Sequence, residues 1–64
     1  MTTANHLFQA CHVRRGVAAG FEVNRQSEKV VNCAPILRRL ILGLPLRSAE
    51  GRLQDNGYVV EHVS

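Results

Sequence analysis

The sequence predicts a small α+β domain in which an antiparallel sheet of three to five short strands packs against one amphipathic helix, with room for a second short helix. Stretches rich in β-branched and aromatic residues at 6–14, 21–33 and 58–63 are typical of strands. Apolar residues at helical spacing fill 35–43. Residues 1–64 are expected to form a single domain, because a chain of this length supports only one core.

The first half of the chain predicts strands joined by short turns. Residues 6–14 contain neither glycine nor proline, and we interpret them as a strand. The small-residue stretch 16–20 (GVAAG) predicts a turn or a bulged connection. Residues 21–33 predict a hairpin with a loop at 26–28, because apolar Phe21 and Val23 alternate with the polar residues that follow each of them.

A helix is predicted at about 35–43. Pro35 suits the first helical turn, where its missing N–H costs no hydrogen bond. Gly43 can end the helix in a left-handed cap, and Pro45 prevents its continuation. The apolar stripe of this helix consists of Ile36, Leu37, Leu40, Ile41 and Leu44.

Residues 48–57 fit two structures. In one, Ser48 caps a short helix that runs to Asp55 and ends at Asn56-Gly57. In the other, which we favour, Asn56-Gly57 is a type I′ hairpin turn. The hairpin would pair Asp55 with Tyr58, Leu53 with Val60, and Arg52 with Glu61, as cross-strand pairs prefer. Both structures end in a strand at 58–63.

The net charge of +3 is concentrated in the middle of the chain. Seven of the eight basic residues are arginines, whose planar donor groups suit phosphate and carboxylate. A solvated helix face in a protein from a GC-rich genome would show the same bias. We predict contact with nucleic acid, or with an acidic protein surface, through Arg38, Arg39, Arg47 and Arg52, with Arg14 and Arg15 as a second patch.

Residues 38–54 (RRLILGLPLRSAEGRLQ) resemble the helix-turn-helix family, with Gly43 as the turn glycine and Ala49 as a packing position on the second helix. The resemblance implies that this helix enters the major groove and exposes Arg47, Ser48 and Arg52. The segment departs from the family at Arg39, where a small residue is usual, and at Arg52, where an apolar one is usual.

The spacing of the histidines, cysteines and carboxylates gives little indication of a catalytic or metal site. The candidate ligands lack the closely spaced pairs typical of zinc sites; they are His6, Cys11, His12, Cys33 and His62. The carboxylates are scattered, and so small a chain rarely encloses a substrate pocket. We therefore expect no enzyme activity, no metal and no cofactor, and we expect both cysteines to be thiols in a reducing compartment.

The sequence as a whole predicts a small, basic, non-enzymatic binding protein, a cytoplasmic regulator that contacts nucleic acid. By analogy alone, compact basic chains of this kind occur among phage and mobile-element regulators. The alternative is a protein-protein interaction module, an inhibitor or adaptor, that uses a sheet edge or the apolar helix face. The small core favours a homodimer. Residues 1–13 lack the features of a signal peptide, and no apolar run is long enough to span a membrane.

Overall fold

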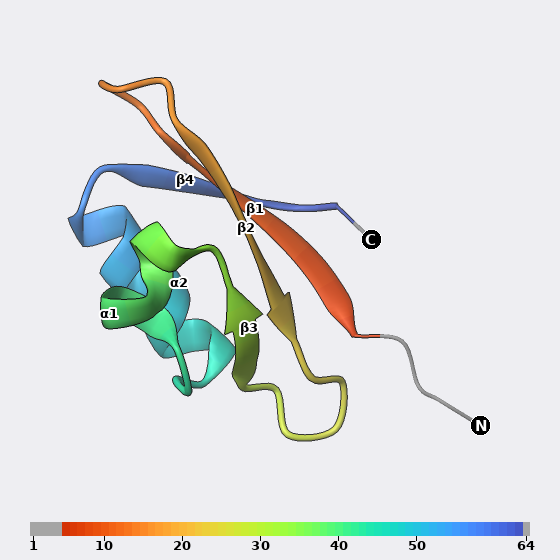
Figure 1. Cartoon of the computed structure of the whole chain (residues 1–64). Helices are drawn as coiled ribbons and strands as arrows, with labels where there is room; N and C mark the ends of the chain where they lie inside the picture. Colours follow the sequence, from red (N-terminus) through yellow and green to blue (C-terminus); the bar gives the residue numbers. More distant parts are fainter. Residues whose placement is uncertain (1–4, 64) are drawn as a thin grey trace.

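The structure, a computed structural model, describes residues 5–63 and contains a four-stranded antiparallel sheet in the order β3-β2-β1-β4 (Figure 1). The first three strands follow one another as a meander, and β4 returns after the helices to pair with β1. The elements are β1 (His6–His12), β2 (Ala18–Val23), β3 (Val30–Cys33), the 3₁₀ turn η1 (Pro35–Leu37), α1 (Arg38–Ile41), α2 (Leu46–Asp55) and β4 (Tyr58–His62).

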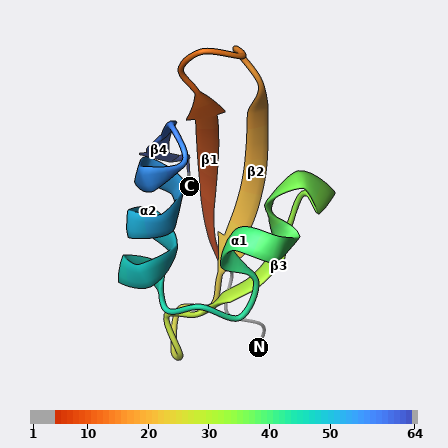
Figure 2. The same ribbon diagram turned by 90° about the vertical axis from the view of Figure 1, so that its left-hand side faces the viewer.

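The helices lie together on one side of the sheet (Figure 2). α2 packs against β4 and against α1, and α1 in turn contacts β3. We call η1, α1 and α2 the helical layer. The predicted α+β class is confirmed, and the four strands fall within the predicted range.

The two sides of the sheet differ because successive side chains of a strand point to opposite sides. Along β2, Ala19, Phe21 and Val23 are buried under the helical layer, whereas Ala18 and Gly20 are exposed on the other side. We call that second side the open sheet face. The register places on it Leu7, Gln9, Cys11, Ala18, Gly20, Glu22, Asn32, Val59, Glu61 and Val63.

The core lies between the helical layer and the sheet. From the helices, Leu37, Ile41 and Leu53 are fully buried, each with 0% of its surface exposed. The sheet contributes Phe21 from β2 and Tyr58 from β4, among others. Burial of large aliphatic side chains is the main stabilising contribution to a domain of this size, so the helical layer and the sheet depend on each other.

β3 fits the core through a bulge. The register of β3 on β2 shifts between Glu22 and Val23, which inserts one extra residue into β3. As a result Val30 and Cys33, three positions apart, are both buried on the core side. The predicted hairpin over 21–33 is thus confirmed, with an irregular return strand.

The turn predicted over 16–20 is wrong for its second half, because β2 begins at Ala18. β2 is an interior strand that bonds to β3 and β1, and this pairing on both sides outweighs the weak strand propensity of small residues. Ala19 lies opposite Ala10 in the core, where larger side chains would meet the helical layer.

The helix predicted at 35–43 is confirmed, as η1 followed by α1. Pro35 occupies the first turn, as expected. The helix ends at Ile41, and Gly43 follows with a φ of +83°, a left-handed conformation that glycine adopts without strain.

The hairpin favoured for the C-terminal region is wrong, because residues 46–55 form the helix α2. Asn56 and Gly57 end this helix instead of turning between two strands. Gly57 has a φ of +85°, and its N–H donates to the carbonyl of Gln54 at 3.0 Å. The strand after it is present as predicted, but it pairs with β1 and not with its immediate neighbour.

Burial explains why the helix forms. Ala49 and Leu53 are four residues apart, so they share one helix face, and both are fully buried. Packing of such a face stabilises a short helix more than propensity does. The helix also begins earlier than the alternative with Ser48 as its cap, since Leu46 is its first residue and Pro45 is the N-cap.

Gly51 weakens α2 without a packing reason. It is exposed, and a Cβ at this position would meet no atom within 4 Å. Alanine favours a helix over glycine by about 0.5–1 kcal/mol. We expect Gly51→Ala to raise the free energy of unfolding by about that amount, measured as a higher urea midpoint with an unchanged m-value. A lower midpoint would contradict an exposed helix at this position.

Candidate nucleic-acid interface

The six arginines predicted to contact nucleic acid are all exposed, but they occupy two regions. Arg38 and Arg39 lie on α1, Arg47 and Arg52 on α2, and Arg14 and Arg15 in the turn between β1 and β2. That turn projects beyond the helices at one end of the molecule (Figure 1). The structure therefore places four of the six in the helical layer.

The short first helix separates apolar from charged side chains. Leu37 and Ile41 lie one helical turn apart and are fully buried. Arg38 and Arg39 fall between them in the sequence, which turns them away from the buried face, and both are exposed. The guanidinium groups of α1 are thus available to a ligand on the helical side.

α2 directs its two arginines to different sides of its exposed surface. Its buried face is formed by Ala49 and Leu53. Arg47 and Arg52 are five positions apart, which corresponds to about 140° around the helix axis, and Gly51 lies between them in the exposed strip. Two guanidinium groups that diverge in this way suit two separate anionic groups better than a single one.

Charge is separated between the two sides of the molecule. The helical layer, residues 35–55, carries four arginines and two acids, the half-buried Glu50 and the exposed Asp55 at the end of α2. The open sheet face has two acids, Glu22 and Glu61, and no lysine or arginine among the residues that the register assigns to it. We call Arg38, Arg39, Arg47 and Arg52 the arginine face.

Sequence reasoning missed Lys29, which the fold brings to the start of α2. Lys29 forms an isolated β-bridge with Pro45, and the N–H of Leu46 donates to the carbonyl of Glu28 at 2.8 Å. Lys29 is exposed and lies beside the helix end that carries Arg47. Only the long-range contact reveals this neighbour, because no local pattern joins the two segments.

The second patch, Arg14 and Arg15, is held by a histidine. Nδ1 of His12 accepts hydrogen bonds from the backbone N–H groups of both arginines, each at 3.2 Å. The turn and residues 54–57 line a common hollow of about 570 Å³. Asp55 belongs to that lining, so an acid lies close to this patch and offsets part of its charge.

The two cysteines are free thiols on opposite sides of the sheet. Cys11 is exposed on the open sheet face, and Cys33 is buried in the core. Burial raises the pKa of the Cys33 thiol, and the positive charge of Arg38 opposes that effect. A protonated, buried thiol is a poor nucleophile, so neither the position nor the charge of Cys33 suggests catalysis.

Residues 5–63 contain neither a cluster of metal ligands nor a membrane-spanning helix. His6 and His62 lie close, with ring centroids 5.3 Å apart. Within residues 5–63, however, no three His, Cys, Asp or Glu side chains are grouped so that they could hold a metal ion. In the same range, no helix has the length and apolar character needed to cross a membrane.

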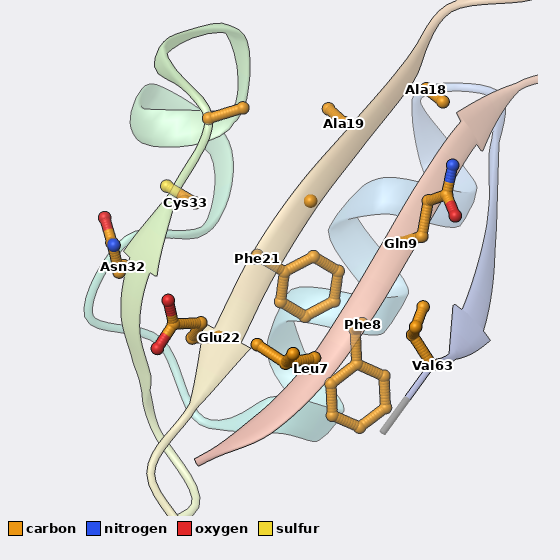
Figure 3. A pocket seen from close by; sticks show the side chains of 12 residues that line it. Leu7, Phe8, Gln9, Ala18, Ala19, Phe21, Glu22, Asn32, Cys33 and Val63 are labelled. Carbon is orange, nitrogen blue, oxygen red and sulfur yellow. The ribbon is translucent and has the colours of Figure 1, made fainter. Parts of the chain in front are cut away.

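The open sheet face contains a shallow hollow of about 490 Å³ (Figure 3). Leu7 and Val63 contribute apolar surface to it, and Gln9, Glu22 and Asn32 contribute polar groups. A phosphate would meet a carboxylate and no base there. The hollow therefore does not compete with the arginine face as a site for nucleic acid.

The aromatic side chains also lie away from the arginine face. Phe21 and Tyr58 are buried in the core, and Phe8 stacks on Phe21 with ring centroids 5.3 Å apart. Bases of a single strand need exposed aromatic side chains on which to stack.

Comparison of the chain with protein-family models, with curated proteins and with solved structures finds no match.

Proposed function

We propose that this chain is a non-enzymatic regulator that contacts the phosphate backbone of duplex nucleic acid, DNA in the first place, through its arginine face. The observation that carries the proposal is the separation of charge between the two sides. The helical layer exposes four guanidinium groups, whereas the charged groups that the register assigns to the open sheet face are the carboxylates of Glu22 and Glu61. Arginine binds phosphate with several donors at once, so such a surface favours a polyanion.

Two further observations support a duplex as the ligand. The core position of Phe21 and Tyr58 provides no stacking platform for single-stranded bases. The exposed strip of α2 has Gly51 at its centre, and a residue without a side chain lets a phosphate backbone approach the helix closely. The free thiols fit a reducing compartment, and we place the protein in the cytoplasm.

The test compares matched charge-neutralised variants. The first carries Gln at Arg38, Arg39, Arg47 and Arg52; the second carries Gln at Arg14 and Arg15. At about 50 mM salt we expect the wild-type protein to bind duplex DNA, with log K falling against log salt by about 0.9 per phosphate contact. The first variant should lose at least about tenfold in affinity and show a flatter salt dependence.

The control separates this face from general basicity. Because Asp55 lies beside Arg14 and Arg15, the second variant should lose less affinity per charge removed than the first. Binding to an acidic polypeptide with the same number of negative charges as the duplex tests whether the ligand is an acidic protein surface. Undetectable binding of the wild-type protein at low salt, or equal losses per charge in the two variants, would overturn the proposal.

A further inference from the structure

The two edges of the sheet differ in how the chain covers them. At the β3 edge, the N–H of Val30 donates to the carbonyl of Leu44, and the N–H of Gly43 donates to the carbonyl of Val30, both at 2.9 Å. The segment before α2 thus covers this edge at Val30. At the outer edge of β4, no backbone group of the described chain forms such a bond.

The register identifies the backbone groups that β4 leaves free. The N–H of Val63 donates to the carbonyl of Leu7 on β1 at 2.8 Å. Successive residues of an antiparallel strand direct their N–H and C=O groups to opposite sides, so every second residue counted back from Val63 also faces β1. The N–H and C=O groups of Tyr58, Val60 and His62 are therefore directed to the outer edge.

β4 has no lysine, proline or bulge to protect its exposed edge, and Glu61 is its one charged side chain. Proteins limit edge pairing with lysine, proline, bulges or a covering segment. The sequence of β4 is YVVEH, which contains β-branched and aromatic residues and a single formal charge at Glu61. Such a strand is a template for a further strand.

We propose that β4 pairs antiparallel with β4 of a second copy of this chain, forming a continuous eight-stranded sheet about a two-fold axis. The pairing places Val60 opposite the partner's Val60, and Tyr58 opposite the partner's His62. On the other side of the strand, Val59 lies opposite the partner's Glu61. No two like charges are directly opposite in this register, so the edge is complementary to itself, as a two-fold interface requires.

The contact area sets the expected strength of the dimer. β4 is about 17 Å long and the molecule is 18 Å thick, so each copy presents a side of only about 300 Å². Standard protein interfaces bury about 800 Å² per partner. We therefore expect a dissociation constant in the micromolar range and not in the nanomolar range.

The inference does not depend on the proposed function, but it would extend it. A two-fold axis between antiparallel neighbouring strands is perpendicular to the sheet. Both helical layers then lie on the same side of the eight-stranded sheet, and the two arginine faces point in the same direction. The number of arginines available to one duplex would double.

The test places a charge at Val59, which lies opposite the partner's Glu61 in the proposed register. Val59 is 50% exposed, so a polar residue there leaves the core intact. We expect sedimentation of the wild-type protein between about 10 μM and 1 mM to show a monomer–dimer equilibrium. Val59→Glu would oppose the partner's Glu61 twice in each dimer, and we expect it to raise the dissociation constant about tenfold. Val59→Lys, which loses the same apolar side chain, should leave the constant unchanged or lower it.

Leu7→Glu and Leu7→Lys are the matched controls. Leu7 is exposed on the same sheet face but lies on the interior strand β1, so neither change should alter dimerisation. Circular dichroism verifies that each variant is folded. A wild-type monomer at 1 mM would overturn the proposal, as would equal weakening by Val59→Glu and Val59→Lys. Dissociation by the Leu7 variants would place the second copy on the open sheet face instead.

Discussion

Gly57→Ala is expected to lower the free energy of unfolding by about 2–4 kcal/mol, a large share of the roughly 3–10 kcal/mol available to a chain of this size. Gly57 has a φ of +85°, which strains any residue with a Cβ. A Cβ there would also lie 3.0 Å from Nε2 of His12, a contact that forces one of the two to move. Urea unfolding followed by circular dichroism measures the loss.

Gly43→Ala is the control that separates backbone strain from the contact. Gly43 has nearly the same φ, +83°, but a Cβ there would have no atom within 4 Å. We expect a loss of about 1–2 kcal/mol there, from strain alone. In the Gly57→Ala background, His12→Ala should cost less than it does in the wild-type protein. Equal losses from the two glycine variants would show that His12 does not constrain Gly57.

Leu53→Ala is expected to lower the free energy of unfolding by about 2–5 kcal/mol, because Leu53 is fully buried between α2 and the sheet. The cavity would weaken the attachment of the helix that carries Arg47 and Arg52. Leu42→Ala makes the same chemical change at a side chain that is 48% exposed, and it should cost less than about 1 kcal/mol. Similar urea midpoints for the two variants would contradict the packing of α2 described above.

Local sequence patterns predict those elements that are determined by their own end residues and by a regular apolar period. The helix over 35–43, with Pro35 and Gly43 at its ends, is confirmed because its end residues and its apolar period agree, but Ile36 of the predicted stripe is 48% exposed and lies outside the buried face. The region before Gly57 was not decided by local pattern, because a glycine with positive φ ends a helix as readily as it forms a hairpin turn. The partner of β4 decides between them, and that partner is β1, far away in the sequence.

For the candidate site, the sequence predicted the exposure of the arginines better than their neighbours in the fold. Exposure of Arg38 and Arg47 follows from helix periodicity, since the buried faces of the two helices are formed by Leu37 and Ile41 and by Ala49 and Leu53. The contact of Lys29 with the start of α2, and the position of Asp55 beside the β1–β2 turn, depend on tertiary packing. Such neighbours have no signal in a single sequence.

A titration of ¹⁵N-labelled protein with a short DNA duplex, followed by amide chemical shifts, tests most directly whether the arginine face is the contact surface. We expect the largest changes at the amides of 38–41 and 46–52, in fast exchange, and we expect them to shrink as salt is raised. The amides of 7–11 and 59–61, on the strands of the open sheet face, should change little. Changes concentrated on those strands, or none in the helical layer at low salt, would contradict the assignment of nucleic-acid contact to these helices.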